Sequence, residues 1–213
     1  MKKSFLSILC ILATLAATQA LAVGDPKAGK AKVAVCAGCH GTDGNSMVPS
    51  FPKLAGLGEK YMTEQLRNVK SGERVILEMT GILSFSSDQD LQDMAAYYDS
   101  QTRLISGASN IDLIGVSGPK EALAYGENIY RAGNMKTGVA ACIGCHSPSG
   151  SGNNPAGYPA LGGQYAGYIE KQLLGYRRGE RTSGTNALIM RGVAANLSDK
   201  EIKAVANYIA GLN

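Results

Sequence analysis

One five-residue motif, Cys-x-x-Cys-His, occurs twice in this chain of 213 residues, at 36–40 and at 142–146. The two copies contain both histidines of the chain and four of its five cysteines. Thiol and imidazole chemistry is therefore concentrated at two places, and any fold of this chain has to present both.

The motif is typical of the covalent attachment of a c-type haem. Two cysteines three residues apart lie on one helical turn, where their thiols can form thioethers with the two vinyl groups of a porphyrin. The histidine that follows can then place an imidazole nitrogen on the iron. We therefore predict two covalently bound haem c groups. The predicted attachment residues are Cys36, Cys39, Cys142 and Cys145, and the predicted proximal ligands are His40 and His146.

Three other uses of these residues are open but explain less. A zinc site needs four convergent ligands, usually from two separated pairs, whereas each motif offers three crowded groups. A thioredoxin-like redox pair belongs to a βαβ context, which the sequence does not show. Structural disulfides would leave the two adjacent histidines unexplained.

The first residues, 1–22, have the pattern of a cleavable secretory signal peptide. Two lysines precede an apolar run at 5–17, and Ala20-Leu21-Ala22 is a small-x-small cleavage site. The run is shorter than the roughly 20 apolar residues that span a bilayer, which disfavours an uncleaved anchor. The net charge of +4 is too small for a nucleic-acid-binding surface, so we expect no nucleic-acid partner.

An internal duplication indicates two domains rather than one. Besides the motif, the segments 52–56 and 61–66 recur at 159–163 and 168–173, and Gly72-Glu-Arg recurs at 179–181. The repeat predicts an all-α protein with two tandem domains. We expect an N-terminal domain at 23–100, a linker at 101–119 and a C-terminal domain at 120–213.

Helical periodicity supports this division. Each half reads as a helix, the motif, a glycine-rich loop, a helix, a loop with a methionine and a last helix. Ser87 and Ser198 are expected N-caps of the last helices, the second with a full capping box. The other predicted helices cover 27–35, 60–70, 121–132 and 167–177.

The two histidines are both used as proximal ligands, so a methionine sulfur is the strongest candidate for the sixth position on each iron. Of the seven methionines, only Met79 and Met190 recur in both halves, each followed by x-Gly and each before a capped helix. We therefore predict Met79 and Met190 as metal ligands. Met62 and Met94 align with Ile169 and Val205 and are expected in the core.

Taken together, these residues resemble the dihaem cytochrome c4 family. The resemblance implies two class I cytochrome c domains, each wrapped around one covalent haem, in a periplasmic electron-transfer protein and not an enzyme. It implies that Pro52 and Pro159 accept a hydrogen bond from the proximal histidines. The implied partners are a quinol-oxidising complex and a terminal oxidase, with peripheral membrane association allowed and a monomeric state expected.

Two other functions stay open. The chain could be the dihaem electron-transfer subunit of a dehydrogenase, such as a flavocytochrome sulfide dehydrogenase. It could also be a dihaem peroxidase or a thiosulfate-oxidising cytochrome, which would need an open iron position. For Tyr61, Arg74, Tyr168 and Arg181, contact with haem propionates, contact between domains and exposed helix ends are the alternatives.

Overall fold

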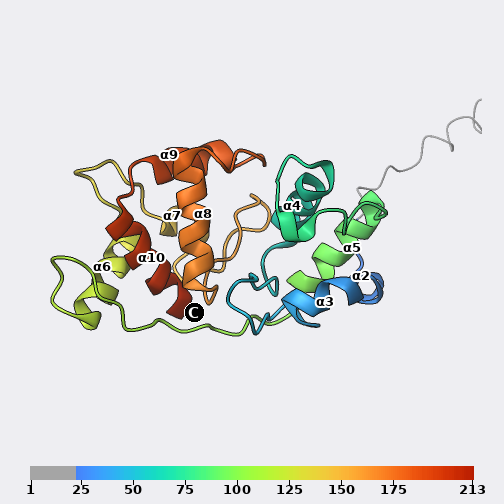
Figure 1. Ribbon diagram of the computed structural model, residues 1–213, viewed down its shortest axis with the longest axis horizontal. Coiled ribbons are helices and arrows are strands. Elements are labelled where there is room, and N and C mark those ends of the chain that lie inside the picture. The colour runs from blue at the N-terminus through green and yellow to red at the C-terminus, as the bar shows by residue number, and fades with distance from the viewer. Residues whose placement is uncertain (1–22) are drawn as a thin grey trace, which may run out of the picture.

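The computed structural model describes residues 23–213, so the predicted signal peptide lies outside the described residues. Two groups of helices lie side by side, joined by an extended segment along one side of the molecule (Figure 1). The first group is α2 (Pro26–Lys32), α3 (Ala34–His40), α4 (Glu59–Ser71), the short 3-10 helix η2 (Leu77–Met79) and α5 (Asp88–Asp99). The second group is α6 (Pro119–Ala132), α7 (Ile143–His146), α8 (Ala166–Arg178), α9 (Ala187–Ala195) and α10 (Asp199–Gly211).

Over residues 23–213 the chain forms no extended strand, only isolated bridges between Asn134 and Val139 and between Asn153 and Tyr158. This confirms the all-α prediction. None of the helices described combines the length and the apolarity needed to cross a membrane.

In each half, the first helix packs against the last one at a glycine. A Cβ added to Gly29 of α2 would lie 1.9 Å from the backbone oxygen of Asp93 in α5. A Cβ added to Gly126 of α6 would lie 2.2 Å from the oxygen of Ala204 in α10. Both helix pairs therefore approach more closely than any larger residue would permit.

The last helices bury the apolar stripes that periodicity predicts. Leu91 and Tyr98 of α5 are each 1% exposed, and Ile202 of α10 is fully buried. Both helices begin with a complete capping box, at Ser87 and at Ser198. The first box uses an aspartate, Asp90, in the place that glutamate usually takes.

Two predicted elements differ in the structure. The expected helix at 27–35 is divided at Val33, so that a separate helix, α3, carries the first motif. The expected loop around Met190 is the helix α9, because its sequence Ala-Leu-Ile-Met-Arg is rich in strong helix formers.

The connecting segment follows the C-terminal half closely. Leu113 is buried against Ala122 and Ala204, with Ile111 and Val116 partly buried beside it. The segment therefore lies against a domain surface, as its apolar residues predict.

Candidate functional site

Each motif occupies the end of a short helix that delivers its histidine into the protein. His40 ends α3 and His146 ends α7, and their side chains are 8% and 6% exposed. The four motif thiols are not joined in disulfides. No group of three or more His, Cys, Asp or Glu side chains converges among residues 23–213, which is unlike a zinc site.

Both motif helices stop at a residue with positive φ, 80° at Gly41 and 69° at Ser147. Serine adopts this conformation rarely, but here its hydroxyl accepts a hydrogen bond from the backbone N–H of Ser151 at 2.9 Å. Ser147 stands where the first half has Gly41, and the backbone turn after the motif is nevertheless the same in both halves.

The ring orientation of both histidines is fixed by a proline carbonyl. His40 Nδ1 lies 2.8 Å from the oxygen of Pro52, and His146 Nδ1 lies 2.9 Å from that of Pro159. A carbonyl only accepts, so Nδ1 carries the proton and Nε2 is the nitrogen available to a metal. Burial lowers the pKa of both histidines, while the bond to the proline carbonyl opposes this shift, so the neutral imidazole is favoured.

The two predicted methionine ligands lie on different kinds of element. Met79 ends the 3-10 helix η2 and packs against the core of the N-terminal half. Met190 lies inside α9 and packs against a small cluster of Tyr176, Ala187 and Ala194. Both side chains are partly buried.

The residues present fit a covalently bound porphyrin. In each half, two free thiols are available for bonding to a porphyrin, and a buried neutral imidazole is a donor suited to haem iron. Apolar side chains flank these donors in the sequence, as an apolar macrocycle requires. Those with substantial exposure are Val35, Leu77, Ile82, Phe85, Leu188 and Ile189.

Repeated tyrosine, glutamine and arginine residues meet between the two halves. Arg181 donates to the Tyr61 hydroxyl at 2.5 Å and to Gln65 at 3.0 Å. Arg74 donates to the Tyr168 hydroxyl at 3.2 Å and to Gln172 at 3.3 Å, in the mirrored arrangement. We call these six residues the interdomain cluster.

No carboxylate pairs with either arginine of the cluster within residues 23–213. Arg181 is only 8% exposed, and its Nε has no hydrogen-bond partner there. Of the alternatives for these side chains, contact between the domains is the one that the geometry supports directly.

A second set of interdomain contacts was not foreseen from the sequence. Gln164, 2% exposed, forms two hydrogen bonds with the backbone of Lys53. Arg103 of the connecting segment donates to the carbonyl oxygens of Ala55 on one side and of Ala160 and Gly162 on the other. The available signal was a break in the repeat, because Gln164 stands where the first half has Leu57.

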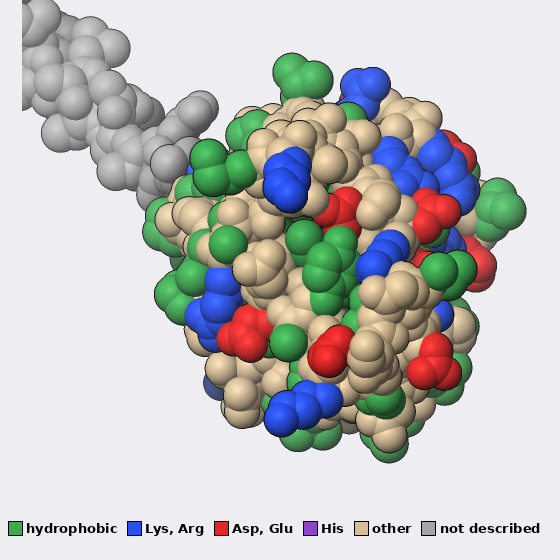
Figure 2. Space-filling model, turned by 90° about the vertical axis from the view of Figure 1, so that its left-hand side faces the viewer, with side chains coloured by type: hydrophobic (Ala, Val, Ile, Leu, Met, Phe, Trp, Pro, Cys, Tyr) green, Lys and Arg blue, Asp and Glu red, His purple; other side chains and the backbone are tan. Residues whose placement is uncertain are grey.

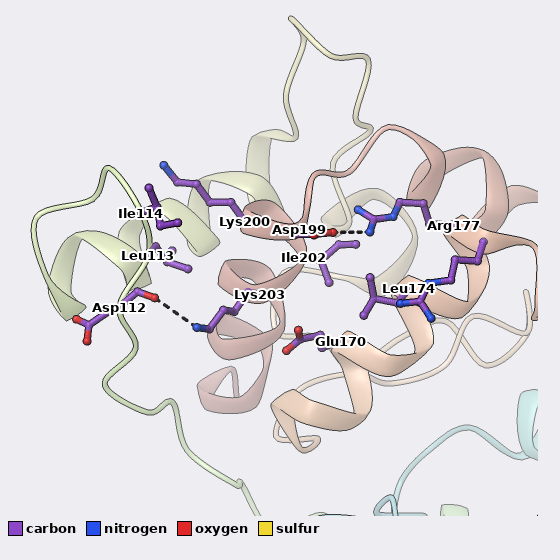
Figure 3. A pocket seen from close by; sticks show the side chains of 11 residues that line it. Asp112, Leu113, Ile114, Glu170, Leu174, Arg177, Asp199, Lys200, Ile202 and Lys203 are labelled. Atoms are coloured by element: carbon purple, nitrogen blue, oxygen red, sulfur yellow. Dashed lines mark hydrogen bonds and ion pairs between the residues drawn. The ribbon is translucent and has the colours of Figure 1, made fainter.

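A hollow of about 360 Å³ opens on the C-terminal half, between the connecting segment, α8 and α10 (Figure 3). Two of its charged side chains have partners. Arg177 forms an ion pair with Asp199, and Lys203 donates a hydrogen bond to the backbone oxygen of Asp112. On the end of the molecule seen in Figure 2, basic and acidic side chains are interspersed. Neither motif contributes a residue to this hollow, so it is separate from the haem sites.

Comparison with known proteins identifies close relatives. The family model described as Cytochrome c matches residues 26–102 and again 124–213. Cytochrome c4 of Stutzerimonas stutzeri is 49% identical over 217 residues, covering 97% of this chain and 98% of the relative. A crystal structure of reduced recombinant cytochrome c4 from Pseudomonas stutzeri matches with a TM-score of 0.82 and 48% identity, covering 90% of this chain and 100% of that one.

A more distant relative has a different description. The thiosulfate dehydrogenase electron acceptor of Thiomonas intermedia is 34% identical over 205 residues, covering 93% of this chain and 88% of the relative.

Proposed function

Because this chain belongs to the cytochrome c4 family of dihaem electron-transfer proteins, we propose that it carries electrons in the periplasm from a quinol-oxidising complex to a terminal oxidase. The protein has two cytochrome c domains and two covalently attached haem c groups, and it is an electron carrier rather than an enzyme. The observation that carries the proposal is the buried histidine of each motif, held with Nε2 available to iron.

We assign the haem-binding residues within each half. The thiols of Cys36 and Cys39 hold one porphyrin and those of Cys142 and Cys145 hold the other. His40 with Met79 would hold one iron, and His146 with Met190 would hold the other. A haem iron supplies the one-electron couple between the ferric and ferrous states.

The side chains of this protein set the conditions for that couple. The bond from Nδ1 to a proline carbonyl fixes each imidazole ring and makes it a better electron donor. The thioether of methionine favours ferrous iron and raises the potential. With a histidine and a methionine on each iron, no position would be open to substrate and little would have to rearrange when an electron moves.

The remaining assignments follow from the sequence pattern. We propose a signal peptide at 1–22, domains at 23–100 and 120–213, and a linker at 101–119. The protein acts as a monomer, and any membrane association is peripheral. Its partners are redox proteins and not nucleic acids.

A second function has a specific observation in its favour. A relative at 34% identity is described as an electron acceptor of thiosulfate dehydrogenase. This chain could likewise accept electrons from a dehydrogenase, as in the alternative of a flavocytochrome sulfide dehydrogenase subunit. Co-purification of the tagged protein with a dehydrogenase would favour this function, and reduction by a quinol-oxidising complex would favour the first.

Optical spectra of the purified protein test the ligand assignment. We expect a far-red methionine-to-ferric-iron band with the intensity of two haems, and no spectral change of the reduced protein with carbon monoxide. Half of that band, together with carbon monoxide binding, would mean that one iron is open and would contradict a pure carrier.

Substitution of the two methionines tests each ligand separately. We expect Met79→Ala and Met190→Ala each to remove half of the far-red band, to open one iron to carbon monoxide and to lower the potential of that haem. Met47→Ala and Met135→Ala are matched controls, because these side chains are 85% and 96% exposed, and should leave the band intact. A full band in Met79→Ala or Met190→Ala would refute that ligand.

A further inference from the structure

The peptide group that anchors His40 is bonded at both ends. Its carbonyl, from Pro52, accepts from His40 Nδ1 at 2.8 Å. Its N–H, from Lys53, donates to Gln164 Oε1 of the C-terminal domain at 3.0 Å. Gln164 Nε2 in turn donates to the carbonyl of Lys53 at 2.8 Å, so both ends of the glutamine amide are engaged.

The peptide group that anchors His146 has the same arrangement with the domains exchanged. Its carbonyl, from Pro159, accepts from His146 Nδ1 at 2.9 Å. Its N–H, from Ala160, donates to the backbone oxygen of Leu57 in the N-terminal domain at 3.1 Å. Each proximal histidine is thus one peptide group away from the other domain.

Hydrogen bonds that share a peptide group reinforce one another. When the N–H donates, the amide becomes more polarised and its carbonyl oxygen becomes a better acceptor. A stronger bond from the imidazole N–H to that oxygen makes the imidazole a stronger donor to iron. A stronger donor stabilises the ferric state and lowers the reduction potential.

We propose that Gln164 is a positioning residue through which docking of the C-terminal domain lowers the potential of the N-terminal haem. This inference rests on the proposed ligation of that haem by His40. The position suits this role, since Gln164 is only 2% exposed and its amide is shielded from bulk solvent. The buried Lys53 side chain, bonded to the Leu104 carbonyl, holds the same loop against the connecting segment.

The two histidine-anchoring peptide groups donate to different kinds of acceptor in the other domain, and only one of these acceptors can be removed by substitution. The acceptor for the N-terminal peptide is a side chain, whereas the acceptor for the C-terminal peptide is the backbone oxygen of Leu57. A substitution at Gln164 therefore removes one contact and leaves the other in place. The effect should fall on one haem only.

The test is a redox titration of Gln164→Met, with the haem methyl resonances of each domain followed by NMR. Methionine has a similar length and no strong acceptor. We expect the N-terminal haem to become easier to reduce by about threefold in its equilibrium constant, about 28 mV at 59 mV per tenfold change. The His40 Nδ1 proton of the reduced protein should move upfield, and the C-terminal haem should keep its potential.

Tyr165→Phe is the matched control. It removes a different hydrogen bond between the domains, from the Tyr165 hydroxyl to the backbone oxygen of Ser46, without touching the Pro52–Lys53 peptide. We expect both potentials and the His40 proton to stay as in the wild type. Equal shifts of both haems, or the same shift in Tyr165→Phe, would mean a general effect of loosened domains and would overturn the proposal.

Two further outcomes are decisive. An unchanged N-terminal potential in Gln164→Met, with the far-red band intact, overturns the proposal and leaves the ligation standing. A wild-type protein without that band would instead refute the proposed ligation. If Gln164→Met does not fold, Gln164→Leu replaces it: leucine also lacks an acceptor, so the His40 Nδ1 proton should move upfield, and an unmoved proton overturns the proposal.

Discussion

At the scale of the residue, Gly126 decides how closely α6 and α10 can approach. A Cβ at this position would lie 2.2 Å from a backbone oxygen of α10, which cannot rotate away as a side chain would. We expect Gly126→Ala to push the helices apart and to lower the free energy of unfolding by about 1–3 kcal/mol, the usual cost of overpacking. Chemical denaturation followed by circular dichroism measures this loss.

Gly167→Ala provides the control for that substitution. Gly167 lies in α8 with no atom near the position of a Cβ, so alanine there should be neutral or slightly stabilising. Equal stability of the two variants would contradict the close packing of α6 on α10.

At the scale of the element, α5 carries a buried carboxylate, Asp93, at a position where α10 has an alanine. Burial raises the pKa of Asp93, but hydrogen bonds from the Asp25 backbone and from the side chains of Lys32 and Gln89 outweigh it, so the pKa is lowered below 3.8. A lowered pKa means that the folded state binds this proton less readily than the unfolded state. The contribution of the ionised Asp93 to the free energy of unfolding is therefore complete above pH 3.8. It is lost as the pH falls through the pKa of Asp93 in the folded state.

We expect Asp93→Asn to flatten the loss of stability of the N-terminal domain as the pH falls below about 4. The repeat places Ala204 at the equivalent position of α10, so the C-terminal domain should behave alike in both proteins. Urea unfolding at several pH values, followed at the absorption of each haem, makes the comparison. An unchanged slope in the N-terminal domain would show that Asp93 titrates normally.

At the scale of the whole molecule, the interdomain cluster joins the two halves through Arg181. Its loss would leave the Tyr61 hydroxyl and the Gln65 oxygen at the interface without this donor. We expect Arg181→Met to weaken the interface by about 2 kcal/mol, a typical value for hydrogen bonds to a charged group. Calorimetry should then resolve two melting transitions in place of one.

Arg191→Met is the control for this prediction. Arg191 is exposed on α9 and outside the cluster, so its loss should leave the melting curve as it was. A single, unshifted transition in Arg181→Met would show that the cluster does not hold the domains together.

The sequence predicted the parts of the fold that local chemistry determines. The helix stripes of α5 and α10 and their serine caps follow from residues close in the chain, and so does the motif that ends in each histidine. The hydrogen bonds from the histidines to Pro52 and Pro159 came from the family resemblance and are present in the structure. The ligation of iron by Met79 and Met190 stays a prediction.

What the sequence did not predict depends on contacts between distant residues. Gln164 and Lys53 meet only because the domains dock, and no periodic pattern marks either one. By analogy with Met79, the repeat predicts a loop around Met190, although the residues there favour the helix that the structure has. The repeat predicted the capped last helix of both halves and failed at 187–195, where the second copy forms a helix.

The mirrored form of the interdomain cluster bears on the ancestry of the chain. Arg74 meets Tyr168 as Arg181 meets Tyr61, which is the reciprocal pattern of a symmetric homodimer. Two identical single-domain chains could make the same contact, but only as far as their concentration allowed. Joining the copies in one gene fixes their effective concentration and frees each copy to diverge, as at Gln164 and Leu57. The pairing of the two domains thereby becomes independent of how much of the protein the cell makes.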